Sequence, residues 1–356
     1  MINKKYFSVF IAGIFSAFAV QAHEAYVLPR STFWGILNNP DPVNLFADVL
    51  KNPADLHVAF YVILGVAVLL LANFFFRRSK AGKKVSNEFE KFSSIGPLFI
   101  RAAVAVSLFL SATSMSFLGP ELQLQNMPVA HILQIGLYAA SIMIAFGIFT
   151  EVGAIISLVV FSAGAISYGL YMITYLNYFA EFVVLLLFGM RTFSVDKYIF
   201  GPARRFKFFR KYETTIVRVG YGIALIFAAV TVKLLHPSLT LDVINDYNLT
   251  QFHWLFPSDP ELIVLGAFLV ETAMGFFIMI GFELRLTVLI SLFYLTLSVI
   301  FFKEMVWPHL ILYGISFNLL LQPEVFTLDH LLLKKHRRKK SWWKRPFSPH
   351  VKELRR

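Results

Sequence analysis

Three ionisable residues, Glu271, Arg218 and Lys233, lie within long apolar runs of this chain. A charged side chain at the centre of a bilayer costs about 2.5 kcal/mol or more, so such residues are rare and often functional. Glu271 lies well inside its run, where a protonated carboxyl can relay protons or bind a quinone or a substrate hydroxyl. The alternative is a structural hydrogen bond or ion pair with Arg218 or Lys233. These three residues form the candidate catalytic set.

Histidines supply a second group of candidates, because neutral imidazole binds zinc, copper and haem iron and exchanges protons near neutral pH. The candidate metal ligands are His23, His57, His131 and His253. The candidate ligands of a quinone or haem cofactor are His236, His309 and Glu181. The alternative is that these are ordinary polar residues near helix ends.

His23 has an additional property if a signal peptide is cleaved after Ala22. An N-terminal histidine offers its amino nitrogen and its Nδ1 to one metal ion. With one further histidine this makes a three-nitrogen site that suits the tetragonal preference of copper. The segment HEAYVLP resembles the mature N-termini of exported copper-handling proteins. The alternative is that signal peptidase tolerates histidine at this position.

The composition is that of a membrane protein. Hydrophobic residues make up 57% and charged residues 15% of the chain, whereas soluble domains have about 25% charged residues. The net charge of +12 is concentrated in loops and in the tail, which indicates membrane topology and argues against a nucleic-acid partner. Since the chain has no cysteine, it has no disulfides, Cys-ligated iron–sulfur clusters, thiolate zinc sites or cysteine nucleophiles.

Residues 1–22 are typical of a cleavable signal peptide, with Lys4 and Lys5 before a short apolar core. An uncleaved anchor helix is the alternative. Residues 23–56 then form a periplasmic N-terminal segment. The chain is therefore expected to be an all-α membrane protein with about nine transmembrane helices after the signal. The expected helices are 57–76, 97–118, 131–149, 152–172, 174–190, 214–236, 261–281, 285–302 and 305–322.

Positive charges are distributed in agreement with this count. Lysines and arginines gather at 77–91, at 191–211 and in the tail after 323, whereas the loops near 119–130 and 237–260 have none. Because cytoplasmic loops are enriched in Lys and Arg, the mature N-terminus is predicted outside and the C-terminus inside. The expected location is the bacterial inner membrane, with the lipid bilayer as the main partner.

The two halves of the chain resemble each other. Arg101 and Arg218 each open an apolar helix that follows a basic loop, and the next two helices turn at GIFTEVGAI and GFELRLTVLI. We therefore expect tandem four-helix units at 97–190 and 214–322. The remaining segments are the first helix with its basic loop (57–96), a second basic loop (191–213) and a basic tail (323–356).

At these residues the chain resembles the DoxX/DoxD family of four-helix membrane proteins. The second unit is the better match, through Arg218, Lys233, the ETAMGFFIMIGFELR stretch and His309. In the first unit Ser116 stands where Lys233 aligns, and Glu151 where Arg285 aligns. The resemblance implies a small helical bundle and a link to quinone-coupled oxidation of sulfur compounds such as thiosulfate.

Three functions remain open from the sequence. The first is a membrane subunit of a quinone-linked oxidoreductase, with quinone and a redox subunit as partners. The second is a copper-handling membrane protein that uses His23. The third is a solute transporter or an assembly factor without a cofactor. The sequence has no GxxxxGK[ST], GxSxG or HExxH motif, and it does not determine the oligomeric state.

Overall fold

The chain folds into helices throughout the part that the computed structural model describes, which comprises residues 24–51, 53–125, 127–189, 194–200, 209–252, 256–322 and 326–331. The predicted signal peptide lies outside these residues. The described residues contain no strand beyond an isolated bridge between Ser116 and Gln123. The first helices are α2 Glu24–Val27, α3 Arg30–Leu37, α4 Leu45–Lys51, α5 Pro53–Arg78 and α6 Lys80–Lys91.

Two groups of long apolar helices follow. The first group is α7 Gly96–Thr113, α8 Ala130–Phe146, α9 Thr150–Tyr168 and α10 Leu176–Phe188, with α11 Val195–Phe200 after it. The second group is α12 Glu213–Ala228, α14 Pro260–Ile280, α15 Leu284–Phe301 and α16 Leu310–Leu321. The short α13 Pro237–Asp246 lies between α12 and α14.

A helix occupies each of the ranges predicted from the sequence. Among the described residues, five segments are long and apolar enough to cross a membrane. They are Gly96–Thr113, Thr150–Phe188, Glu213–Leu234, Pro260–Ile280 and Leu284–Phe301. Two further apolar helices, Ala130–Phe146 and Trp307–Leu321, are shorter. The all-helical membrane architecture is thus supported, and the number of nine crossings stays a prediction.

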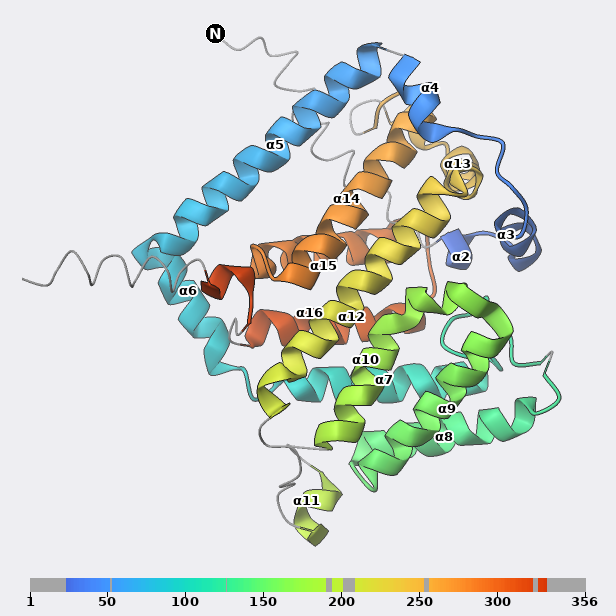
Figure 1. Cartoon of the computed structure of the whole chain (residues 1–356), viewed down its shortest axis with the longest axis vertical. Helices are drawn as coiled ribbons and strands as arrows, with labels where there is room; N and C mark the ends of the chain where they lie inside the picture. The colour runs from blue at the N-terminus through green and yellow to red at the C-terminus, as the bar shows by residue number, and fades with distance from the viewer. Residues whose placement is uncertain are drawn as a thin grey trace, which may run out of the picture.

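The two helix groups pack in the same order and close against each other (Figure 1). In sequence order, α7 packs on α8, α8 on α9 and α9 on α10, and α12, α14, α15 and α16 follow the same pattern. The groups meet where α10 packs on α12 and α16 packs on α7. The last helix of each group therefore contacts the first helix of the other group.

Small residues permit close approach at matching places in these contacts. A side chain at Gly220 would meet Ala180, and one at Gly314 would meet Ala103. These pairs occupy the two contacts between the groups, because Ala180 belongs to α10 and Gly314 to α16. Membrane helices associate through such small residues because lipid provides no hydrophobic drive between them.

Each group also has the same kind of turn between its second and third helices. The residues Gly147 and Phe149, and likewise Gly281 and Glu283, have positive φ between 45° and 68°, the left-handed region that terminates a helix. A segment after the last helix of each group holds this turn. The Asp196 amide donates to the Gly147 carbonyl (2.9 Å) and the Asp329 amide to the Gly281 carbonyl (3.2 Å).

Asp196 caps the start of α9, and its replacement is expected to weaken the fold. Its carboxylate accepts hydrogen bonds from the Phe149 amide (2.8 Å), the Thr150 amide (3.0 Å) and the Thr150 hydroxyl (3.0 Å). Asp196→Ala should lower the free energy of unfolding by about 1–2 kcal/mol, the usual effect of losing a helix cap. Denaturation followed by circular dichroism measures this, with the exposed Asp246→Ala as control. Equal stability of the two variants would contradict the capping role.

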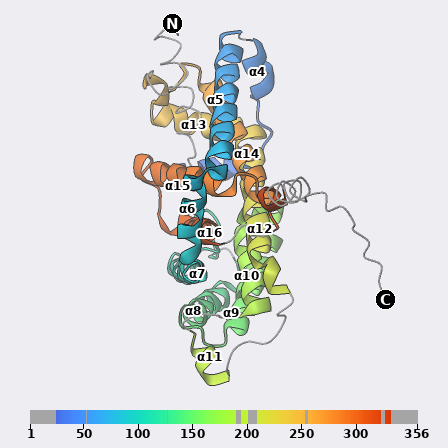
Figure 2. The ribbon, with the colours of Figure 1, turned by 90° about the vertical axis from the view of Figure 1, so that its left-hand side faces the viewer.

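The helix α5 lies along one edge of the bundle, and α6 leads from its end towards α7 (Figure 2). Ion pairs of two arginines attach these helices to the second group. Arg77 of α5 contacts Asp329 (2.6 Å) and Glu283 (3.4 Å). Arg285 of α15 contacts Glu90 of α6 (3.0 Å). These contacts lie at the end of the molecule that the charge pattern predicts to be cytoplasmic.

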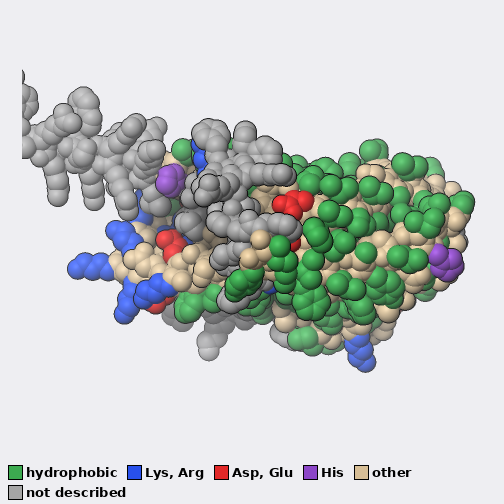
Figure 3. Space-filling view, turned by 90° about the horizontal axis from the view of Figure 1, so that it is seen from below, with side chains coloured by type: hydrophobic (Ala, Val, Ile, Leu, Met, Phe, Trp, Pro, Cys, Tyr) green, Lys and Arg blue, Asp and Glu red, His purple; other side chains and the backbone are tan. Residues whose placement is uncertain are grey.

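The surface is divided into a charged end and an apolar body (Figure 3). Lysine and arginine side chains gather at the left of that view, on the side where Figure 1 places α6. Exposed aliphatic and aromatic side chains predominate in the right-hand part of that view, and on α8 and α9 they include Ile132, Ile135, Phe146, Val159 and Ile166. Such a continuous apolar surface is stable in contact with lipid.

Candidate functional site

A lysine between two carboxylates forms the centre of the candidate site. The Lys233 Nζ lies 3.0 Å from Glu271 Oε1 and 3.1 Å from Glu24 Oε1. The Thr240 hydroxyl donates a 2.7 Å hydrogen bond to Glu24 Oε1. Glu24, Lys233 and Glu271 are 1%, 3% and 6% exposed. We call these three residues the buried ion centre.

The backbone at Lys233 departs from α-helical geometry. The helix α12 continues as a π-helical turn over Ala229–Leu234, which contains Lys233. Single π-helical turns inside longer helices often occur at functional sites, since the extra residue re-aims the side chains around it. Here the turn directs Lys233 between Glu271 on α14 and Glu24 on α2. Of the pairings considered for Glu271, the one with Lys233 is therefore the one formed.

A buried histidine–carboxylate pair accompanies the ion centre. His309 Nε2 lies 2.6 Å from Glu304 Oε2, and the Ser298 hydroxyl donates to the other oxygen of Glu304. His309 and Glu304 are 1% and 5% exposed. Glu304 interacts electrostatically with Glu271, so the pair belongs to the same electrostatic environment as the ion centre.

The net charge of the ion centre determines its chemistry. Two carboxylates and one ammonium leave one negative charge in excess when all three are ionised. An uncompensated charge is costly in a medium of low dielectric constant. One bound proton would remove this excess, and the Thr240 hydroxyl offsets part of it by donating to Glu24. The Thr240 hydroxyl and the nearby imidazole of His309 are further groups that exchange hydrogen bonds or protons.

The other candidate residues lie elsewhere. The Arg218 guanidinium donates a 3.0 Å hydrogen bond to the Phe326 carbonyl, on the side of the molecule that carries Asp329. His236 lies just before α13 and is half-buried, and its Nδ1 lies 2.8 Å from the Thr231 carbonyl of the π-helical turn. Arg218 is thus separate from Lys233, although one helix carries both.

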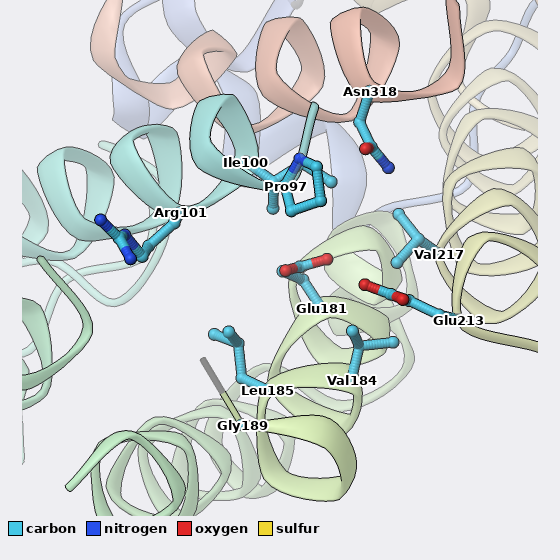
Figure 4. A pocket seen from close by; sticks show the side chains of 10 residues that line it. All are labelled: Pro97, Ile100, Arg101, Glu181, Val184, Leu185, Gly189, Glu213, Val217 and Asn318. Carbon is cyan, nitrogen blue, oxygen red and sulfur yellow. The ribbon is translucent and has the colours of Figure 1, made fainter. Parts of the chain in front are cut away.

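Glu181 lines a different cavity, between α7, α10 and α12 (Figure 4). Its carboxyl group and that of Glu213 extend from neighbouring helices into this space, and Asn318 borders it. Arg101 lies on the other side of Glu181 in this view. The cavity has a volume of about 30 Å³, which is room for a water rather than for a quinone or a haem.

The described part of the chain does not bring the candidate metal ligands together in one site. His57 on α5 and His131 on α8 are both exposed, and His23 and His253 lie outside the described residues. Among the described residues, no group of three or more His, Cys, Asp or Glu is arranged to hold a metal ion. The copper site at His23 stays a prediction.

Sequence reasoning missed Glu24, Thr240, Glu304 and a fourth polar residue, Glu121. Glu24 is the second residue after the predicted cleavage site and belongs to a helix of four residues, so no periodic pattern marked it. Glu304 stands five residues before His309 in an apolar region, a signal that could have identified the pair.

No family model, curated protein or solved structure matches this chain. The resemblance to the DoxX/DoxD family therefore stays a prediction that rests on the residues quoted above. What the chain does has to be argued from its own geometry.

Proposed function

We propose that this chain is a multi-pass inner-membrane protein whose buried ion centre exchanges protons during quinone-linked redox chemistry. In this proposal nine helices follow a cleaved signal, and two tandem four-helix units of the DoxX type form the bundle. The matched helix order and the matched turns at Gly147 and Gly281 support the two units. The basic end of the molecule would face the cytoplasm.

The observation that carries the proposal is Lys233 held between Glu24 and Glu271 in a buried site. Reduction or oxidation of a quinone moves protons together with electrons, so such a protein needs buried groups that accept and return protons. Carboxylates, imidazole and hydroxyl groups with few water contacts serve this purpose. The resemblance to the DoxX/DoxD family suggests quinone as the redox partner and sulfur compounds such as thiosulfate as the electron source.

The quinone-linked function predicts that Glu271→Gln weakens quinone binding by about tenfold, or ~1.4 kcal/mol, because one hydrogen bond to a charged group is lost. Isothermal titration calorimetry of the purified full-length protein with a short-chain ubiquinone analogue measures this. Titrations in buffers of different ionisation enthalpy give the number of protons exchanged on binding. Glu271→Asp should keep part of the affinity, because it keeps the carboxylate.

Glu151→Gln is the matched control, since Glu151 is half-buried in the first turn of α9 and belongs to the turn region of the other group. It should bind the analogue as the unmodified protein does. If the unmodified protein binds no quinone analogue, or if Glu271→Gln binds it equally well with the same proton exchange, the quinone-linked function is wrong. Elemental analysis of the same sample tests the copper alternative, which predicts stoichiometric copper that is lost in His23→Ala.

A further inference from the structure

A second buried carboxylate, Glu121, lies outside the membrane-spanning helices in the loop between α7 and α8. Its side chain is 2% exposed. One oxygen, Oε1, accepts hydrogen bonds from the Tyr175 hydroxyl (2.5 Å) and the Tyr171 hydroxyl (3.1 Å). The other oxygen, Oε2, is buried without a hydrogen-bond partner among the described residues. A buried carboxylate oxygen without a donor is costly unless it carries a proton or meets a bound molecule.

Glu121 borders a pocket at the surface of the molecule. The pocket has a volume of about 340 Å³ and is also lined by Arg30, Trp34, Gln123 and Tyr168. Trp34 donates a 3.2 Å hydrogen bond to the Glu121 carbonyl, and Arg30 donates to the Pro120 carbonyl. These contacts fasten the loop to α3. The arrangement places a buried carboxyl group at the wall of this pocket, on the side that the charge pattern predicts to be outside.

A hydrogen-bonded chain leads inward from this carboxyl group. The Tyr175 hydroxyl, which contacts Glu121, also lies 3.1 Å from the Tyr26 hydroxyl. The ring of Tyr26 packs edge-on against the ring of His309, with centroids 5.1 Å apart. Tyr26 also belongs to the same short helix as Glu24 of the buried ion centre. The hydrogen bonds thus run from Glu121 to Tyr26, and the ring contact places Tyr26 beside the His309–Glu304 pair.

A small cavity provides the last connection. It has a volume of about 20 Å³ and is lined by Tyr26, Tyr175, Asn177 and Pro308, among others. This volume is sufficient for about one water. Asn177 Oδ1 is buried there without a hydrogen-bond partner among the described residues, and a water would satisfy it. Tyr26 lines this cavity and also packs against the His309 ring, so a water there would stand beside the step from Tyr26 to the imidazole.

We propose that Glu121 is a proton-loading site, which takes protons from the outer pocket and passes them through Tyr175 and Tyr26 to the His309–Glu304 pair. A proton bound by Glu121 is donated to the Tyr175 oxygen as Tyr175 donates its own proton to Tyr26. Tyr26 then releases a proton through the water to His309. Each hydroxyl ends with one proton, and the imidazole–carboxylate pair has gained one.

The electrostatic surroundings of Glu121 agree with this role. Burial raises the pKa of Glu121 to about 7, while hydrogen bonds from Tyr175 and Tyr171 and the charge of Arg30 oppose the rise. Burial and the charge of Glu121 also raise the pKa of Tyr26 well above its ordinary value. Tyr26 therefore stays protonated at neutral pH and passes a proton on by accepting one as it releases another. Glu121, in contrast, gains or loses its charge near neutral pH.

Infrared difference spectroscopy of the full-length protein between about pH 5 and about pH 9 tests the loading step. Ordinary carboxyl groups titrate near pH 4, whereas Glu121 should lose its protonated carboxyl band with a midpoint near 7. Glu121→Gln should lack this band, and Glu151→Gln and Glu271→Gln should retain it. Retention in Glu271→Gln makes the test independent of the quinone-linked function on which the proposal rests. Because the buried ion centre holds further carboxyl groups, the comparison is made in the Glu271→Gln background, and a band near pH 7 that is equally strong with and without Glu121→Gln would overturn the assignment.

The transfer step is tested on protein labelled with nitrogen-15 histidine. Solvent exchange of the His309 ring proton, assigned with His309→Gln, should slow by about tenfold or more in Tyr175→Phe, because one proton carrier is removed. Tyr171→Phe is the control, since Tyr171 contacts Glu121 and is absent from the chain to Tyr26. Equal exchange rates in Tyr175→Phe and in the unmodified protein would show that Glu121 and its tyrosines hold the loop and carry no protons.

The pH dependence of thermal stability is a second test of the raised pKa of Glu121. The pKa of Glu121 rises from about 4.5 unfolded to about 7 folded, so the folded state binds more protons in this interval and loses stability as pH rises through it. Glu121→Gln should remove this loss. Relative to the unmodified protein, the variant should therefore be more stable at about pH 8 than at about pH 5. A stability difference that does not change with pH would contradict the raised pKa.

Discussion

Lys233→Met is expected to lower the free energy of unfolding by about 3–5 kcal/mol, the usual cost of removing one partner from a buried ion pair. Methionine has nearly the length of lysine and fills the same space, so the loss is electrostatic. Without the ammonium group, Glu24 and Glu271 are left as two carboxylates that are 1% and 6% exposed. Denaturation of the detergent-solubilised protein, followed by circular dichroism, measures the change.

A triple variant should restore the stability that Lys233→Met loses. In the triple variant Glu24→Gln, Lys233→Met and Glu271→Gln no buried charge remains, and most of the stability should return, because neutral replacement of a buried ion group is often tolerated. Lys51→Met is the matched control. Its ion pair with Asp48 is on the surface, with the lysine side chain 74% exposed, and is worth about 0–1 kcal/mol. A loss in Lys233→Met no larger than in Lys51→Met would show that the three groups share no buried centre.

Arg77→Met is expected to have the second largest effect, again about 3–5 kcal/mol. Arg77 is the cation between Asp329 (2.6 Å) and Glu283 (3.4 Å), whose side chains are 4% and 1% exposed. Its removal leaves two buried carboxylates at the turn before α15 and releases α5 from that turn. Denaturation at neutral pH measures the loss of stability, and hydrogen exchange along α5 measures its release.

The effect of Arg77→Met should shrink at acid pH. Burial and Asp329 raise the pKa of Glu283, and the charge of Arg77 opposes this. Without Arg77 the folded-state pKa rises further, so the variant loses stability as pH increases through that interval and recovers it on acidification. Arg78→Met is the control, because Arg78 mainly covers the ring of Phe74 (3.5 Å), a contact worth about 0.5–1 kcal/mol. Equal effects at Arg77 and Arg78 would contradict the buried arrangement.

The helices could be predicted from the sequence because their signals are local. The split of the long apolar run at Thr150-Glu151 coincides with the start of α9, and the split at Glu283-Leu284-Arg285 coincides with the start of α15. Run length, the intervening polar residues and the basic loops each depend on neighbouring residues only. The same information named Lys233, Glu271 and His309, because an ionisable group in an apolar run is conspicuous in a sequence.

The partners of these residues were not predictable in this way. Glu24 and Lys233 are 209 residues apart in the chain, and neither flanking sequence specifies the other. For the same reason the sequence did not show that the predicted catalytic residues belong to separate sites. Arg218 and Lys233 lie on one continuous helix of α12 and its π-helical turn, yet they make contacts at different levels of the molecule.

The sequence by itself determined that this is an all-helical chain with apolar segments suited to a membrane, and it determined which ionisable residues lie inside them. Only the tertiary structure decided that Lys233 joins Glu271 to Glu24, that His309 pairs with Glu304, and that Tyr26 and Tyr175 connect them to Glu121. The physical reason is that burial in lipid is a property of local composition, whereas charge compensation depends on which distant segments the packing brings within about 3 Å of each other.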